Sequence, residues 1–122
     1  MSTIVHDMLE LSTQIKLYHW QTKVYARHVA SDTLFHDINK LIDKFVEIYI
    51  GKNERPHLQG KTNILKLENY SDAAMVEYLH KMIKYLQDKL PTLIDKKDTD
   101  LLNIRDEMLG LINNTLYLFT FN

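Results

Sequence analysis

Apolar residues recur every three or four positions in four segments of this chain, with polar stretches between them. This period matches the turn of an α-helix that buries one face, and it predicts helices over about 3–23, 28–50, 71–95 and 99–119. The first and third connections are short, whereas about twenty residues join the second helix to the third. A connector of that length lets the chain return to the far end of the molecule. The pattern therefore predicts an all-α four-helix bundle with a long crossover between helices 2 and 3.

The second predicted helix carries two apolar stripes and one polar row. The first stripe is expected to face the bundle core and consists of Leu34, Ile38, Leu41, Phe45 and Ile48. A second stripe lies roughly a quarter turn round the helix and consists of Phe35, Ile42, Val46 and Tyr49. The polar row beyond it contains no Lys or Arg and consists of His28, Asp32, His36, Asn39, Asp43 and Glu47. One core cannot easily use both stripes, so we expect the second stripe to pack against another copy of the chain.

Four residues of the polar row are spaced as two pairs of metal ligands. His28 and Asp32 are one helical turn apart, as are Asp43 and Glu47. The pairs are separated by about 16 Å of straight helix, so they cannot share an ion within one chain. An antiparallel second copy would set the first pair of one chain opposite the second pair of the other. These ligands suit iron, manganese or zinc. The spacing thus predicts two equivalent metal sites in a homodimer, with a merely solvated face as the alternative.

Composition limits the remaining possibilities. The 122 residues include 45% hydrophobic residues, so we expect one domain over residues 1–122 with a single core. No cysteine is present, which excludes disulfides, thiolate metal sites and cysteine nucleophiles. The formal net charge of -1 gives no long-range attraction to nucleic acid or anionic membrane. With no signal-peptide pattern and no long apolar run, we expect a soluble, cytoplasmic protein without a membrane span.

Other candidate residues favour structural roles when judged on spacing alone. His19 follows the apolar row of the first helix, and its spacing favours a partly buried histidine that hydrogen-bonds a neighbouring helix. Trp20 and Tyr25 are expected to pack in the core. The tetrad from Glu77 to His80 is a single Glu-x-x-His motif, so the di-iron arrangement within one bundle is incomplete and both residues are expected on the surface.

Three short motifs together resemble a known metal centre. His19-Trp20, then His28-x-x-x-Asp32 and Asp43-x-x-x-Glu47, are similar to the ferroxidase-centre signature of the Dps (DNA-binding protein from starved cells) mini-ferritins. The resemblance implies a ferritin-like bundle in which His19, His28 and Asp32 of one subunit face Asp43 and Glu47 of its two-fold mate. It implies oxidation of Fe(II) by peroxide or oxygen, with Asp43, Glu47 and His28 as catalytic ligands. It also implies iron storage, protection from oxidative stress and a twelve-subunit cage.

The sequence departs from that family in three places. The turn between His19 and His28 is some three residues shorter, no Lys-rich tail precedes the first helix, and the crossover has no clear amphipathic helix. Two alternatives to a Dps-like ferroxidase follow. One is a structural or interaction bundle that keeps the dimer without catalysis. DNA binding is the third hypothesis and is disfavoured by the missing basic tail and the net charge.

Overall fold

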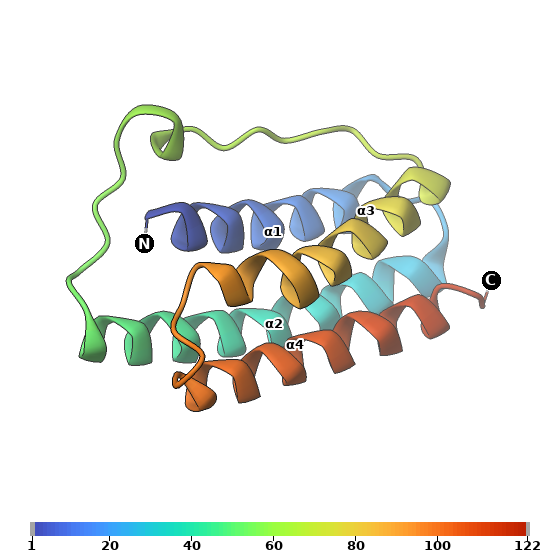
Figure 1. The fold of residues 1–122 in the computed structure, drawn as a ribbon. Helices are drawn as coiled ribbons and strands as arrows, with labels where there is room; N and C mark the ends of the chain where they lie inside the picture. Colours follow the sequence, from blue (N-terminus) through green and yellow to red (C-terminus); the bar gives the residue numbers. More distant parts are fainter. Residues whose placement is uncertain (1, 122) are drawn as a thin grey trace.

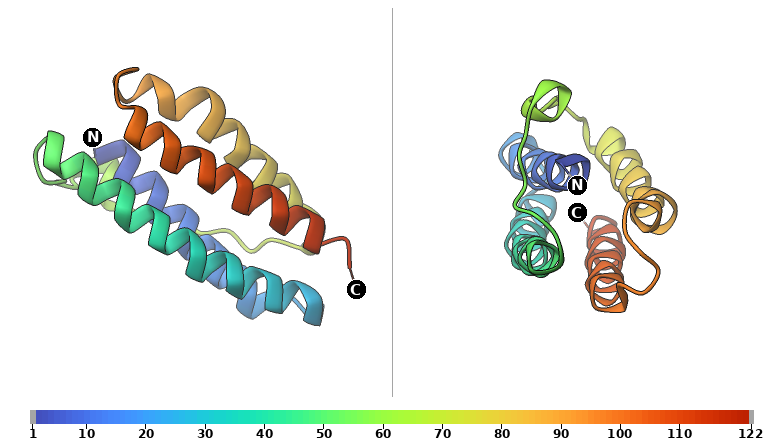
Figure 2. Two further views of the ribbon diagram at one scale, coloured as in Figure 1. Left: turned by 90° about the horizontal axis from the view of Figure 1, so that it is seen from below. Right: turned by 60° about the vertical axis from the view of Figure 1, so that its left-hand side comes forward.

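The protein is an all-α four-helix bundle, as the sequence predicts. The computed structural model describes residues 2–121, in which the long helices are α1 (Ser2–Gln21), α2 (Tyr25–Lys52), α3 (Asp72–Lys84) and α4 (Thr99–Leu118). α1 and α2 form an antiparallel pair, the crossover then runs back beside α1, and α3 is parallel to α2 (Figure 1). Seen nearly end on, the four helices surround one core (Figure 2). None of the helices within residues 2–121 is both long and apolar enough to span a membrane.

The core is built from the predicted helical stripes. The α1 row is buried throughout and consists of Ile4, Met8, Leu11, Ile15 and Tyr18. On α2, however, the core takes residues from both predicted stripes, because α2 packs against α1 on one side and α4 on the other. Ile42 and Tyr49 are only 8% and 9% exposed. The expectation that the whole second stripe stays free for a partner is therefore wrong, and Phe35 and Val46 are its partly exposed members.

Helix α2 is longer at both ends than the sequence pattern indicates. It begins at Tyr25 rather than at residue 28, because the turn after α1 needs only residues 22–24. The Val24 amide donates a hydrogen bond to the Thr22 hydroxyl at 3.2 Å. The Val24 carbonyl accepts the first hydrogen bond of the helix, from the His28 amide, at 2.9 Å. At the other end the helix continues to Lys52, and Asn53 closes it. The first turn of α2 thus brings His28 close to the end of α1.

The third predicted helix changes pitch near Pro91 and ends at Thr92 rather than at residue 95. After α3 come a π-helical turn, η2 (Tyr85–Lys89), and a 3-10 turn, η3 (Leu90–Thr92). The Leu90 amide bonds the carbonyl five residues back, and the next such bond would run from residue 91 to Leu86. Pro91 has no N–H, so Arg105 of α4 donates to the Leu86 carbonyl instead, at 3.1 Å.

The crossover (residues 53–71) includes a short 3-10 turn, η1 (Gly60–Asn63), and then follows α1 in an extended conformation (Figure 1). Side chains spaced one turn apart on α1 bond the backbone of alternate crossover residues. The contacts are His6 Nε2 to Ile64 O at 2.7 Å, Glu10 Oε1 to Lys66 N at 2.8 Å, Gln14 Oε1 to Glu68 N at 2.9 Å and Gln14 Nε2 to Glu68 O at 2.8 Å. We call this set the crossover ladder. It fixes the path that brings the chain back to start α3.

Candidate metal centre

The turn between α1 and α2 is anchored to the start of α3 by Asp72. One carboxylate oxygen of Asp72 accepts the Tyr18 hydroxyl at 2.6 Å and the Thr22 hydroxyl at 2.9 Å. The hydrogen bond from Tyr18 is the largest of the effects that hold the pKa of Asp72 below its ordinary value. Arg27 of α2 donates to the Asp72 backbone carbonyl at 2.7 Å and to the Tyr18 oxygen at 3.1 Å. These bonds hold the two helix ends on which His19 and His28 stand.

His19 and His28 form a reciprocal pair across this turn. Their rings are stacked, with centroids 3.9 Å apart and planes inclined by 16°. His19 Nδ1 lies 2.6 Å from the His28 carbonyl oxygen, and His28 Nδ1 lies 2.8 Å from the His19 carbonyl oxygen. A carbonyl oxygen only accepts hydrogen bonds, so both Nδ1 atoms carry the proton. In the neutral rings each Nε2 therefore holds a lone pair, which is the state in which histidine ligates a metal.

Asp32 lies one turn beyond His28 and gathers basic side chains around one carboxylate oxygen. Its Oδ1 atom is 3.4 Å from Lys16 Nζ, 3.8 Å from His19 Nε2 and 3.4 Å from His36 Nε2. Loss of hydration raises the pKa of Asp32, but the hydrogen bond and positive charge of Lys16, to which His19 and His36 add when they are protonated, lower the pKa below its ordinary value. The carboxylate is thus kept in the charged form that a metal ion requires.

Asp43 and Glu47 form the second predicted pair, and they lie nearer the other end of α2. The hydrogen bond that a protonated Glu47 would donate to Asp43, together with the negative charge of Asp43, raises the pKa of Glu47 above its ordinary value. Both side chains are exposed. Asp43 also borders a groove of about 240 Å³ between α1 and α2, whose other lining residues are Val5, Leu9, Asn39, Ile42 and Val46.

The structure thus brings the predicted ligands together as two separate sets. His19, His28 and Asp32 meet at one end of α2, despite the shortened turn, whereas Asp43 and Glu47 meet about 16 Å further along the helix. Within residues 2–121 of one chain, no three His, Cys, Asp or Glu side chains are arranged to hold a metal ion. We refer below to the histidine set (His19, His28, Asp32) and the carboxyl set (Asp43, Glu47).

The other candidates from the sequence have different outcomes. His19 is buried and bonds the backbone of α2, as its spacing indicates. Glu77 and His80 are exposed on α3, as expected. Trp20 and Tyr25, in contrast, are 69% and 78% exposed, so the expectation that they pack in the core is wrong. Tyr25 instead stands outside the histidine pair, with its ring centroid 6.2 Å from that of His28.

Two residues of the site were missed by sequence reasoning. Ser31 is completely buried and donates its hydroxyl to the His28 carbonyl at 3.2 Å. Lys16 reaches Asp32 from α1, although the polar row of α2 contains no Lys or Arg. The only signal in the sequence is that Lys16 precedes His19 by three residues and so lies on the same side of α1.

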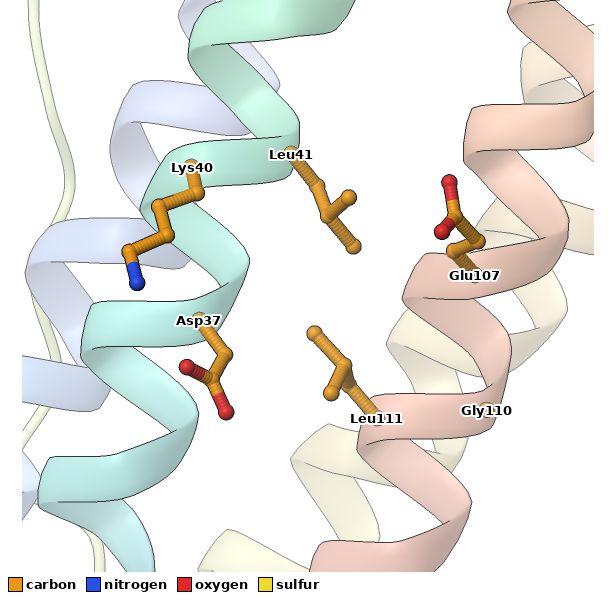
Figure 3. A pocket seen from close by; sticks show the side chains of 6 residues that line it. All are labelled: Asp37, Lys40, Leu41, Glu107, Gly110 and Leu111. Atoms are coloured by element: carbon orange, nitrogen blue, oxygen red, sulfur yellow. The ribbon is translucent and has the colours of Figure 1, made fainter.

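A separate groove of about 400 Å³ lies between α2 and α4, away from both ligand sets. Leu41 and Leu111 extend toward one another across the gap between the helices, as Figure 3 shows. The remaining lining residues are Asp37, Lys40, Glu107 and Gly110. None of its lining residues belongs to the histidine set or the carboxyl set, so this groove does not form part of the candidate centre.

The protein is thus an all-α bundle in which the residues of the two ligand sets lie on α2, except for His19, which lies at the end of α1. The chain belongs to a family described as a family of unknown function (DUF5856), which matches residues 19–119 and so includes both sets. It is also 29% identical over 102 residues to a phage T4 protein named "Uncharacterized 14.6 kDa protein in mobD-ri intergenic region". That similarity covers 84% of this chain and 73% of the phage protein. No solved structure matches the chain.

Proposed function

We propose that this protein is a Dps-like, iron-binding ferroxidase whose site forms across a two-fold interface between two copies. The observation that carries the proposal is the reciprocal hydrogen bonding of His19 and His28, which leaves both Nε2 lone pairs free to ligate and sets that of His19 3.8 Å from the Asp32 carboxylate. Backbone carbonyls hold metal-ligating histidines in this tautomer in many proteins.

The donor atoms suit Fe(II) as substrate. They comprise two imidazole nitrogens and three carboxylates without sulfur, a set that iron, manganese and zinc accept. The His19 Nε2 and Asp32 Oδ1 atoms are 3.8 Å apart, and two donors on one ion are typically about 3.0–3.4 Å apart. A small side-chain adjustment would therefore allow these two atoms to bind the same ion.

The carboxyl set would complete the site from the partner chain. In an antiparallel pair of α2 helices, the histidine set of each chain lies opposite the carboxyl set of the other. Asp43 and Glu47 would be the principal ligands, because carboxylates stabilise Fe(III) more than Fe(II). His28 and His19 would hold the ion through nitrogen, and Asp32 would ligate or orient it. The partly exposed Leu9, Phe35 and Val46 would supply apolar contact between the copies.

The proposed reaction is the oxidation of Fe(II) by peroxide or oxygen. Each peroxide accepts one electron from each of two Fe(II) ions and takes up two protons to leave as two waters. The two Fe(III) products would then be stored if a larger shell assembles. The protein's contribution is to bind the ions next to one another and to provide negative charge for the oxidised product.

A first experiment tests iron binding and oxidation. Anaerobic Fe(II) titration followed by peroxide, monitored by absorbance, should show saturation at about one or two Fe(II) per chain and fast oxidation. The variant Asp43→Asn/Glu47→Gln should lose both, whereas the control Glu77→Gln/Asp88→Asn, which removes two exposed carboxylates of the third helical segment, should behave as wild type. Light scattering should find the same assembly in all three proteins. Absence of binding in the wild type would favour an inactive structural bundle.

A second experiment tests whether the site is shared between chains. His28→Gln and Asp43→Asn/Glu47→Gln chains should each be inactive alone. When they are unfolded together and refolded at equal amounts, half of the dimers should be mixed, and each mixed dimer has one intact site. Activity should then return to about a quarter of wild type. No recovery in a mixture that demonstrably contains mixed dimers would overturn the shared site.

A further inference from the structure

Lys16 contacts Asp32, one of the three residues of the histidine set. Its ammonium group lies 3.4 Å from Asp32 Oδ1, the same oxygen that faces His19 Nε2. The Lys16 side chain is about one quarter exposed, and it comes from α1, one turn before His19. In this conformation the ammonium already supplies the positive charge that balances Asp32.

The same ammonium group contacts two aromatic rings. Lys16 Nζ is 4.7 Å from the centroid of the Phe35 ring and 5.5 Å from the centroid of the Trp20 ring. Both distances are within the range of cation–π attraction. Because lysine has a flexible four-carbon stem, its ammonium can leave Asp32 and remain on these rings. The aromatic pair therefore provides an alternative position for the charge when another cation takes its place.

We propose that Lys16 is a built-in competitor of the metal ion: it neutralises Asp32 in the metal-free protein and must move off that carboxylate when an ion binds. This inference rests on the proposed metal site and adds a threshold in metal concentration, below which the site stays empty. An ion held by His19 and Asp32 would lie next to the ammonium group, and like charges at that distance repel. Metal occupancy therefore requires a concentration high enough to displace Lys16, so the site stays empty at low metal levels.

The test uses Zn²⁺ as a probe that undergoes no redox change, measured by isothermal titration calorimetry on the full-length protein. Lys16→Met keeps an apolar stem and removes the charge. It should lower the Zn²⁺ dissociation constant about tenfold, since no ammonium group pairs with Asp32 or repels the ion. Lys16→Arg should bind no tighter than wild type. The control Lys40→Met removes a lysine that lies on α2, about two turns beyond Asp32. It should leave the Zn²⁺ dissociation constant unchanged. In an Asp32→Asn background, Lys16→Met should no longer change the Zn²⁺ dissociation constant.

Fluorescence provides a second readout that does not depend on affinity. Trp20 is the single tryptophan of the chain, so its emission reports the position of the Lys16 ammonium. Zn²⁺ should change the emission of the wild type and have a much smaller effect on Lys16→Met. If wild type binds Zn²⁺ and Lys16→Met binds it no tighter, the competition is refuted and the metal site stands. If neither protein binds Zn²⁺ or Fe(II), both proposals fail together.

Discussion

Gln14 should contribute more to stability than any other polar side chain of the crossover ladder. It is 1% exposed, and its amide makes two hydrogen bonds to the backbone of Glu68, at 2.8 Å and 2.9 Å. Gln14→Met keeps the length of the side chain and removes both bonds. At about 1 kcal/mol for each hydrogen bond lost, the substitution should reduce the free energy of unfolding by about 2 kcal/mol. For a chain of this size, that loss lowers the melting temperature by roughly 6–10 °C.

Urea unfolding followed by circular dichroism measures this loss, with the denaturant slope unchanged if unfolding stays two-state. Gln21→Met is the matched control, because Gln21 is exposed and its amide bonds only the Asn69 side chain, at 2.7 Å. It should reduce stability by less than about 0.5 kcal/mol. Equal losses in the two variants, or a loss below about 0.5 kcal/mol for Gln14→Met, would show that the buried bonds do not hold the crossover.

Two further predictions concern other polar contacts of the bundle. The hydrogen bond to Asp7 raises the pKa of His6 above 6.5 against the opposing effect of desolvation, and the bond to the Ile64 carbonyl adds to the increase. The stability that His6 contributes is thus complete below pH 6.5 and is lost as the pH rises through the raised pKa. Urea unfolding at several pH values should show this decline in the free energy of unfolding, and the decline should be smaller in His6→Gln. Arg105→Met should lower the free energy of unfolding by about 1–2 kcal/mol, because the Leu86 carbonyl loses its donor. The exposed partner variant Asp106→Asn should shift it by less than about 0.5 kcal/mol, and similar shifts in the two would contradict the role of Leu86.

The helical period predicts the four helices and the parallel relation of α2 to α3, because both follow from the chain's own apolar spacing and connector lengths. It fails for α2 in two ways. A wheel of one helix shows two stripes, but it cannot show that α1 and α4 flank α2 and together bury Ile42 and Tyr49. The early start at Tyr25 depends on a hydrogen bond within the turn, from Val24 to the Thr22 hydroxyl, which has no periodic signal.

The ligand sets show the same division between local and tertiary information. The one-turn spacing of Asp43 and Glu47 places their carboxyl groups together, and in the structure Asp43 lies close enough to raise the pKa of Glu47. That His19 reaches the start of α2 depends on how tightly the turn closes, which spacing alone does not determine. Lys16 belongs to another helix, so the pattern of α2 could not show that Asp32 has a basic neighbour.

The crossover ladder works because two different repeats have nearly the same length. Four residues of helix advance by about 6 Å, and two residues of extended chain advance by about 6.6 Å. Side chains at positions 6, 10 and 14 can therefore meet the backbone at positions 64, 66 and 68 with only about 1.2 Å of accumulated mismatch. One residue inserted between positions 64 and 68 would put the following backbone groups out of step with α1. Insertions in residues 53–63 leave the ladder in register, so this is where the crossover can vary in length.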